Sequence, residues 1–314
     1  MTTVHFVHTG SAYMPELTAY EEHLQQLGHS SQRHKDARTV PNQAAIVWWI
    51  CGRVSRQHAQ RLDQSLHVHE YASASVAPVA WLKDRIKQHL NPTPHYRIFQ
   101  SEWVRQRSGL TDNRTPYCFR DMGVPPQFLI HQAQHAPEFD LVYLGAMSRL
   151  AAFTPTLKAI HQSGLQLLLV GDIPEHVQHQ LKDFNNIHTT GRIEQHQVPD
   201  QLYRARCGLN LMPDTLPLSE QTSTKMLEYL ALGLPVISNA YGWALRYKTA
   251  YPQRIQILDS NSPPEAWTQA LQKTPKISRD RHELHALAWP ELLTQMPIWQ
   301  YLQLSPQKAI HGCG

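Results

Sequence analysis

The stretch Pro213–Ser238 reads PDTLPLSEQTSTKMLEYLALGLPVIS and contains the pattern that decides the fold. Apolar side chains recur at helical spacing over Thr224–Leu232, which predicts a helix with one buried face. Gly233 ends this helix, and Pro235 prevents its continuation. The apolar run that begins at Pro235 is typical of a buried strand. A helix followed at once by a buried strand predicts an α/β fold.

The same alternation extends upstream of this stretch, and several of its expected strands end in glycine. The expected strands are Leu141–Leu144 before Gly145, Leu165–Val170 before Gly171, Ile187–Thr189 before Gly191, and Leu209–Met212. The expected helices between them are Thr156–Gln162, Glu175–Phe184 and Pro199–Arg206. Strands that end in glycine and lead into helices indicate a Rossmann-like sheet, which binds ligands at its carboxyl edge.

The first part of the chain shows a second strand and helix series. Its expected strands are Val4–His8, Ala45–Cys51, Leu66–His69 and Arg97–Gln100, with a helix over Pro15–Leu27. We therefore predict two domains, residues 1–135 and 136–314, with a terminal helix over Leu284–Leu302 in the second.

Composition excludes several classes of protein. The chain has 314 residues, 41% of them hydrophobic, so packed cores are expected and general disorder is excluded. Its longest apolar run, Ala44–Cys51, is too short to cross a bilayer, and the N-terminus lacks a secretory signal pattern. Neither the 4 cysteines nor the 20 histidines show metal-ligand spacing. We expect a cytoplasmic protein without a metal site.

Thr222, Ser223 and Thr224 are expected at the N-terminus of the helix described above. Backbone N–H groups and the helix dipole favour an anion there, and Lys225 adds a full positive charge. Glu220 and Glu228 lie on either side; in a continuous helix, eight residues would separate them by about 12 Å. The spacing suits two ends of one extended ligand, although a solvated helix face would show it too.

These residues resemble the donor site of retaining glycosyltransferases with the GT-B fold, family 4 in particular. The resemblance rests on the Glu-x7-Glu spacing and the Gly-x-Pro-Val segment after it. It implies two Rossmann-like domains facing a central cleft. By the same resemblance, Glu220 contacts the transferred sugar, Glu228 binds the ribose, and Thr222–Lys225 hold the diphosphate. The implied donor is a UDP- or GDP-linked sugar, with no further cofactor.

The resemblance also assigns residues outside the helix. Arg149 matches the first of two phosphate-binding cations, but Thr154 stands where the family has lysine, and the next lysine is Lys158. Either Lys225 supplies the second charge or the phosphate site is weaker. The remaining donor-binding residues are assigned from the loops after strands: Gly10, Gly145, Gly171, Gly191 and Arg192.

The acceptor is expected at the first domain. His69 and Tyr71 follow an expected strand, and either contact the acceptor or are ordinary loop residues. Arg120, beside Asp121, either contacts the acceptor or forms an internal ion pair. Residues 1–135 hold 14 Lys and Arg against 10 Asp and Glu, which favours an anionic or membrane-bound acceptor.

The sequence thus predicts a metal-independent, retaining hexosyltransferase that acts on a saccharide or lipid-linked acceptor, in cell-surface polysaccharide or lipopolysaccharide synthesis. Peripheral contact with an anionic membrane is expected, and nucleic-acid binding is not, because no basic run with interleaved aromatic residues is present. Two alternatives remain: a non-catalytic subunit that binds nucleotide sugars, and a nucleotide-sugar epimerase of similar fold.

Overall fold

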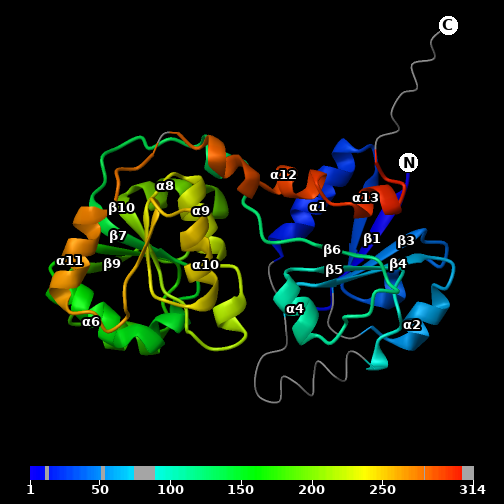
Figure 1. Cartoon of the computed structure of the whole chain (residues 1–314), viewed down its shortest axis with the longest axis horizontal. Helices are drawn as coiled ribbons and strands as arrows, with labels where there is room; N and C mark the ends of the chain where they lie inside the picture. Colours follow the sequence, from blue (N-terminus) through cyan, green and yellow to red (C-terminus); the bar gives the residue numbers. More distant parts are fainter. Residues whose placement is uncertain (11–13, 51–53, 74–88, 279, 306–314) are drawn as a thin grey trace, which may run out of the picture. The chain divides into compact units, whose positions relative to one another are not determined.

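The computed structural model describes residues 1–10, 14–50, 54–73, 89–278 and 280–305. The chain divides into two compact units, each built on its own parallel six-stranded sheet (Figure 1). The first unit comprises Met1–Met122 together with Trp289–Gly314, and the second comprises Gly123–Ala288. The predicted α/β class is confirmed.

In the first unit the strand order is β2-β1-β3-β4-β5-β6. In chain order the strands are β1 (Thr3–Val7), β2 (Ser30–His34), β3 (Ile46–Ile50), β4 (Leu66–Tyr71), β5 (Tyr96–Phe99) and β6 (Tyr117–Phe119). The helices are α1 (Pro15–Gln26), α2 (Arg56–Arg61) and α4 (Glu102–Arg107), with the 3-10 turn η1 (Ala37–Thr39). Helix α1 buries Leu17, Tyr20 and Leu24 on the face that its periodicity predicts.

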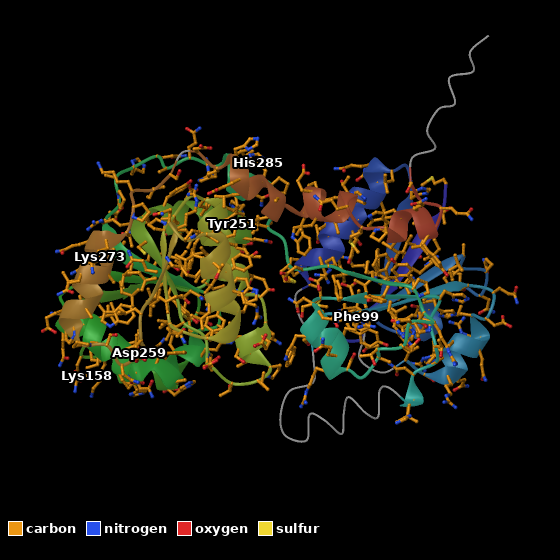
Figure 2. The ribbon with its side chains drawn as sticks, in the orientation of Figure 1. Phe99, Lys158, Tyr251, Asp259, Lys273 and His285 are labelled. Carbon is orange, nitrogen blue, oxygen red and sulfur yellow. The ribbon has the colours of Figure 1, made fainter. Side chains whose placement is uncertain are left out.

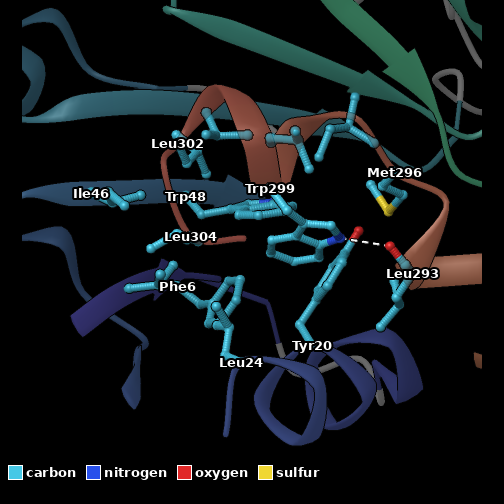
Figure 3. Packing of buried hydrophobic residues seen from close by; sticks show 14 of the residues in the cluster. Phe6, Tyr20, Leu24, Ile46, Trp48, Leu293, Met296, Trp299, Leu302 and Leu304 are labelled. Atoms are coloured by element: carbon cyan, nitrogen blue, oxygen red, sulfur yellow. Dashed lines mark hydrogen bonds between the residues drawn. The ribbon is translucent and has the colours of Figure 1, made fainter. Parts of the chain in front are cut away.

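The C-terminal helices α12 (Trp289–Thr294) and α13 (Ile298–Tyr301) pack into the core of this first unit. Figure 3 shows the Trp299 ring beside Trp48 and Tyr20, with its indole N–H donating to the Leu293 carbonyl at 2.6 Å. The predicted boundaries assigned this segment to the second domain. The difference arises because an amphipathic segment needs an apolar partner, but its periodicity does not say which core provides it.

In the second unit the strand order is β12-β11-β10-β7-β8-β9. The strands are β7 (Phe139–Leu144), β8 (Leu167–Val170), β9 (Ile187–Thr189), β10 (Ala205–Asn210), β11 (Val236–Ser238) and β12 (Ile255–Ile257). Counted from β7, this is the order 3-2-1-4-5-6 of dinucleotide-binding folds. The first three strands extend the sheet to one side and the last three extend it to the other, so the strand order reverses between the first and fourth strands. That switch point lies between β7 and β10.

Helices and 3-10 turns complete the second unit (Figure 1). The helices are α5 (Gln127–Ile130), α6 (Thr154–Gln162), α7 (Glu175–Leu181), α8 (Val198–Tyr203), α9 (Thr224–Ala231), α10 (Gly242–Ala250) and α11 (Pro264–Lys273). The 3-10 turns are η2 (Met147–Phe153), η3 (Gln195–Gln197), η4 (Leu218–Glu220) and η5 (His282–Leu287). None of the helices in the described part of the chain has the length and apolar character needed to span a bilayer.

Three strands do not follow from the sequence pattern: β2, β6 and β12. Each is an edge strand of its sheet. Strand β2 has the polar sequence SSQRH, and its register with β1 pairs Thr3 with Ser30 and Val7 with His34. Edge strands are short and partly solvated, so they lack the continuous apolar run that identifies a central strand.

Candidate active site

Helix α9 begins at the carboxyl edge of the second sheet, beside the switch point. Ser223 precedes its first residue, and the Ser223 hydroxyl donates to Asn210 Oδ1 at 2.8 Å. The Asn210 amide in turn donates to the Ser238 and Tyr241 hydroxyls, at 2.8 and 3.0 Å. This buried network ties the start of α9 to the ends of β10 and β11. The sequence gives no clear signal for it, because polar residues at strand ends resemble loop residues.

Tyr229 holds the middle of α9 against the sheet. Its hydroxyl accepts the Leu144 backbone N–H at 2.7 Å, so the helix is anchored to the end of β7. A Cβ atom added at Gly208, on β10, would lie 2.3 Å from the Tyr229 ring. Gly208 is therefore required for close approach of the ring to the strand.

Lys225 is buried, although a charge in the first turn of a helix is ordinarily solvated. Its ammonium donates to the Tyr143 hydroxyl at 3.2 Å and to the Leu211 carbonyl at 3.3 Å. Tyr143 belongs to β7 and Leu211 follows β10, so the amine lies at the carboxyl ends of the two strands that flank the switch point. The Lys225 side chain also packs against Gly145, where an added Cβ atom would lie 3.3 Å from Lys225 Cε.

The charges of the site perturb one another. Burial, and secondarily the Arg149 cation, lowers the pKa of Lys225 to about 7. Burial also raises the pKa of Glu228 to about 7, partly offset by Lys225. Within the described residues the Glu228 carboxylate has no hydrogen-bond partner, and it forms no ion pair with Lys225 within 4.0 Å. Lys225 and Glu228 thus share this site without a direct ion pair between them.

Arg149 lies on η2, immediately after β7. Its side chain is partly buried, and Nη1 lies 3.7 Å from Met212 Sδ, so it extends toward the end of β10. Lys158 is exposed on α6 (Figure 2), whereas Lys225 reaches the switch point. The site therefore brings Arg149 and Lys225 to the same sheet edge.

The strand-end glycines lie along that edge. Gly145 and Gly171 have φ values of +123° and +142°, which favour glycine, and Gly171 pairs with Gly191 through an isolated bridge. Arg192 and Thr224 are exposed, whereas Thr222 is partly buried.

Glu220 lies outside α9, at the end of η4. Its carboxylate accepts from Arg246 Nη2 at 2.7 Å and lies against Gly242, both on α10. The two glutamates of the Glu-x7-Glu pattern are therefore held by different elements.

The remaining predicted residues belong to the first unit. Gly10 is exposed after β1. His69 and Tyr71 are buried on β4, where His69 Nδ1 lies 3.3 Å from the Tyr71 hydroxyl and burial lowers the pKa of His69 to about 3. Arg120 is buried in an ion pair with Glu70. An acceptor role for His69, Tyr71 and Arg120 stays a prediction, and the Arg120 geometry favours the internal ion pair.

A cavity of about 440 Å³ in the second unit lies away from the Lys225 site. Its lining includes Pro235 and Arg254, which immediately precede β11 and β12. It therefore opens at the amino edge of the sheet, opposite Lys225. Among the described residues, no three His, Cys, Asp or Glu side chains gather closely enough to hold a metal ion.

Residues 138–274, which contain this site, match the family described as glycosyl transferases group 1. Together with the fold, the match supports a glycosyltransferase. The matched segment is less than half of the chain but includes every strand of the second sheet. A search of curated proteins finds no match to the chain.

Solved structures resemble the whole chain. AviGT4, a glycosyltransferase involved in avilamycin A biosynthesis, shares 15% identity with a TM-score of 0.64, covering 97% of this chain and 98% of its own. HepE of Anabaena, in complex with UDP, shares 12% identity with a TM-score of 0.70, covering 96% and 100%. WaaG, a glycosyltransferase involved in lipopolysaccharide biosynthesis, shares 11% identity with a TM-score of 0.54, covering 96% and 97%. At these identities the likeness shows the fold, which is GT-B.

Proposed function

We propose that this protein is a retaining glycosyltransferase that uses a nucleotide-diphosphate sugar, UDP- or GDP-linked. In the proposed reaction the bond between the anomeric carbon and the diphosphate oxygen breaks, and a bond from that carbon to an acceptor hydroxyl oxygen forms. The hydroxyl proton is released, and the nucleoside diphosphate leaves. Glu220 contacts the sugar, and Glu228 accepts hydrogen bonds from the ribose.

The observation that carries this proposal is the position of Lys225 at the switch point. Its amine, Arg149 and the first N–H groups of α9 lie at the sheet edge where such folds bind nucleotides. Negative charge develops on the diphosphate as the sugar departs, and fixed cations in a buried site stabilise it effectively. We propose that these groups act without a required divalent metal.

The acceptor is proposed to be a saccharide or a lipid-linked saccharide of the cell envelope. The net positive charge of residues 1–135 supports attraction to anionic acceptors or to an anionic membrane surface. Liposome co-sedimentation tests the membrane part: binding to anionic vesicles should weaken as NaCl increases, because salt screens the attraction. Absence of binding at low ionic strength would contradict it.

The donor part is tested by thermal shift with UDP, GDP, ADP and CMP and their sugar conjugates, since a ligand that binds only the folded state raises the Tm. Sugar transfer to saccharide acceptors is then measured with the nucleotide sugar that binds, with and without EDTA. Turnover that persists in EDTA supports metal independence, and a loss reversed by Mg²⁺ or Mn²⁺ contradicts it.

The alternatives give different results in the same assays. A non-catalytic subunit would bind nucleotide sugar without hydrolysis or transfer. An epimerase would change the sugar on the nucleotide with no acceptor present. The absence of any nucleotide-induced shift would overturn all three interpretations.

A further inference from the structure

Glu220 is oriented by a helix other than its own element. It is the last residue of η4, a 3-10 turn of three residues, which by itself does little to fix a long side chain. Two residues in the first two turns of α10, Arg246 and Gly242, lie close to its carboxylate.

The first contact is an ion pair. Arg246 Nη2 donates to Glu220 Oε2 at 2.7 Å, with the glutamate side chain 19% exposed and the arginine side chain 57% exposed. Surface pairs of this kind contribute little to stability. The pair nevertheless gives one carboxylate oxygen a charged donor from a neighbouring helix.

The second contact is the bare backbone of Gly242, one helical turn before Arg246. A Cβ added at Gly242 would lie 2.6 Å from Glu220 Oε1 and 3.1 Å from the Ser219 carbonyl oxygen. A larger residue would therefore push the carboxylate away. Since Oε1 ends a flexible side chain, that displacement should change function more than stability.

We propose that Arg246 is a positioning residue for Glu220, and that Gly242 leaves the space in which the carboxylate is held. This inference rests on the proposed function, in which Glu220 contacts the transferred sugar. It adds a specific consequence: loss of either contact impairs the handling of the sugar and leaves binding of the nucleoside diphosphate unchanged, because Lys225 and Arg149 are untouched.

The test compares R246Q, R246K, G242A and E220Q with T249A, a control on an exposed position of α10. The kcat and KM of transfer are measured, together with calorimetric affinities for UDP and UDP-glucose, or for the GDP pair if the thermal-shift panel selects guanine. Urea unfolding confirms that each variant is folded. The double variant E220Q/R246Q completes a double-mutant cycle.

R246Q and G242A should each lower kcat by about tenfold or more, as expected for a displaced catalytic group, with UDP affinity unchanged. R246K should recover part of the loss, T249A should match the original protein, and R246Q should add nothing in the E220Q background. Normal kcat in both R246Q and G242A, with E220Q impaired, would overturn the positioning role alone. Normal transfer by E220Q would overturn the proposed role of Glu220, and absence of nucleotide binding would overturn both proposals.

Discussion

Each unit contains a buried cluster of charges, and the two clusters differ in how well their members are paired. In the first unit, Arg120 pairs with Glu70 and lies 3.7 Å from Glu16. Tyr20 and Trp48 donate further hydrogen bonds to Glu70, the indole at 2.7 Å. In the second unit, Lys225 has two neutral oxygen partners, and among the described residues no carboxylate lies within 4.0 Å of its amine.

The difference separates a cluster whose charges are fully paired from the cluster that we propose binds the donor. Burying a charge is costly unless it is paired, so the saturated cluster of the first unit is complete without any ligand. The Lys225 cation of the second unit lacks a charged partner, so an anionic ligand would lower the free energy of its charged form. Perturbed and unpaired titratable groups at a sheet edge therefore mark the candidate site more clearly than buried charge alone.

The largest effect should follow from breaking the saturated cluster. R120M leaves Glu70 and Glu16 buried without a cation, and should reduce the free energy of unfolding by about 3–5 kcal/mol. Urea denaturation measures this loss. R33Q, which breaks the exposed pair with Glu21, serves as a control and should cost less than about 1 kcal/mol. Equal losses in the free energy of unfolding for R120M and R33Q would show that the buried cluster is no more important for stability than an exposed ion pair.

The opposite pattern is expected for Lys225. K225M removes an amine that burial disfavours, so the free energy of unfolding should stay equal or increase. Sugar transfer should fall about 10²-fold or more, since an electrostatic stabiliser of the leaving diphosphate is lost. Steady-state kinetics and urea denaturation on the same preparation decide this. Near-normal turnover would exclude Lys225 from the stabilisation of the leaving diphosphate.

A smaller effect is expected at Glu228. E228Q should weaken nucleoside diphosphate binding by about 1–3 kcal/mol, because a charged acceptor for the ribose hydroxyls is replaced by a neutral one. Isothermal titration calorimetry measures the change. An unchanged affinity in the folded variant would exclude Glu228 from the donor site.

The smallest effect concerns pH. The pKa values of Lys225 and Glu228 both lie at about 7, so the amine loses its charge above this pH and the carboxylate loses its charge below it. Affinity for a nucleotide sugar, whose diphosphate diester does not titrate here, should peak near pH 7 and fall by up to about tenfold per unit on either side. In E228Q the acidic decline should disappear, and the alkaline decline should begin at a lower pH because Glu228 raises the pKa of Lys225. A flat profile would show that neither group titrates in the site.

Much of the second unit follows from its sequence, and α9 shows why. Its predicted bounds, Thr224–Leu232, differ by one residue from those observed, because periodic apolar residues and a glycine stop are local signals. The network of Asn210, Ser238 and Tyr241 was not predictable in this way. Its members come from two strands and a loop, and only the sheet brings them together.

The sequence by itself determined the alternation of strands and helices, the helix that presents Lys225 and Glu228, and the absence of a long apolar segment. The tertiary structure alone decided that the lysine is buried between the ends of β7 and β10, that α10 orients Glu220, and that the C-terminal helices complete the first core. The physical reason is the distance along the chain over which each effect acts. Backbone periodicity and turn residues act over a few neighbouring positions, whereas the environment of a charge depends on strand order and on which distant segments pack around it.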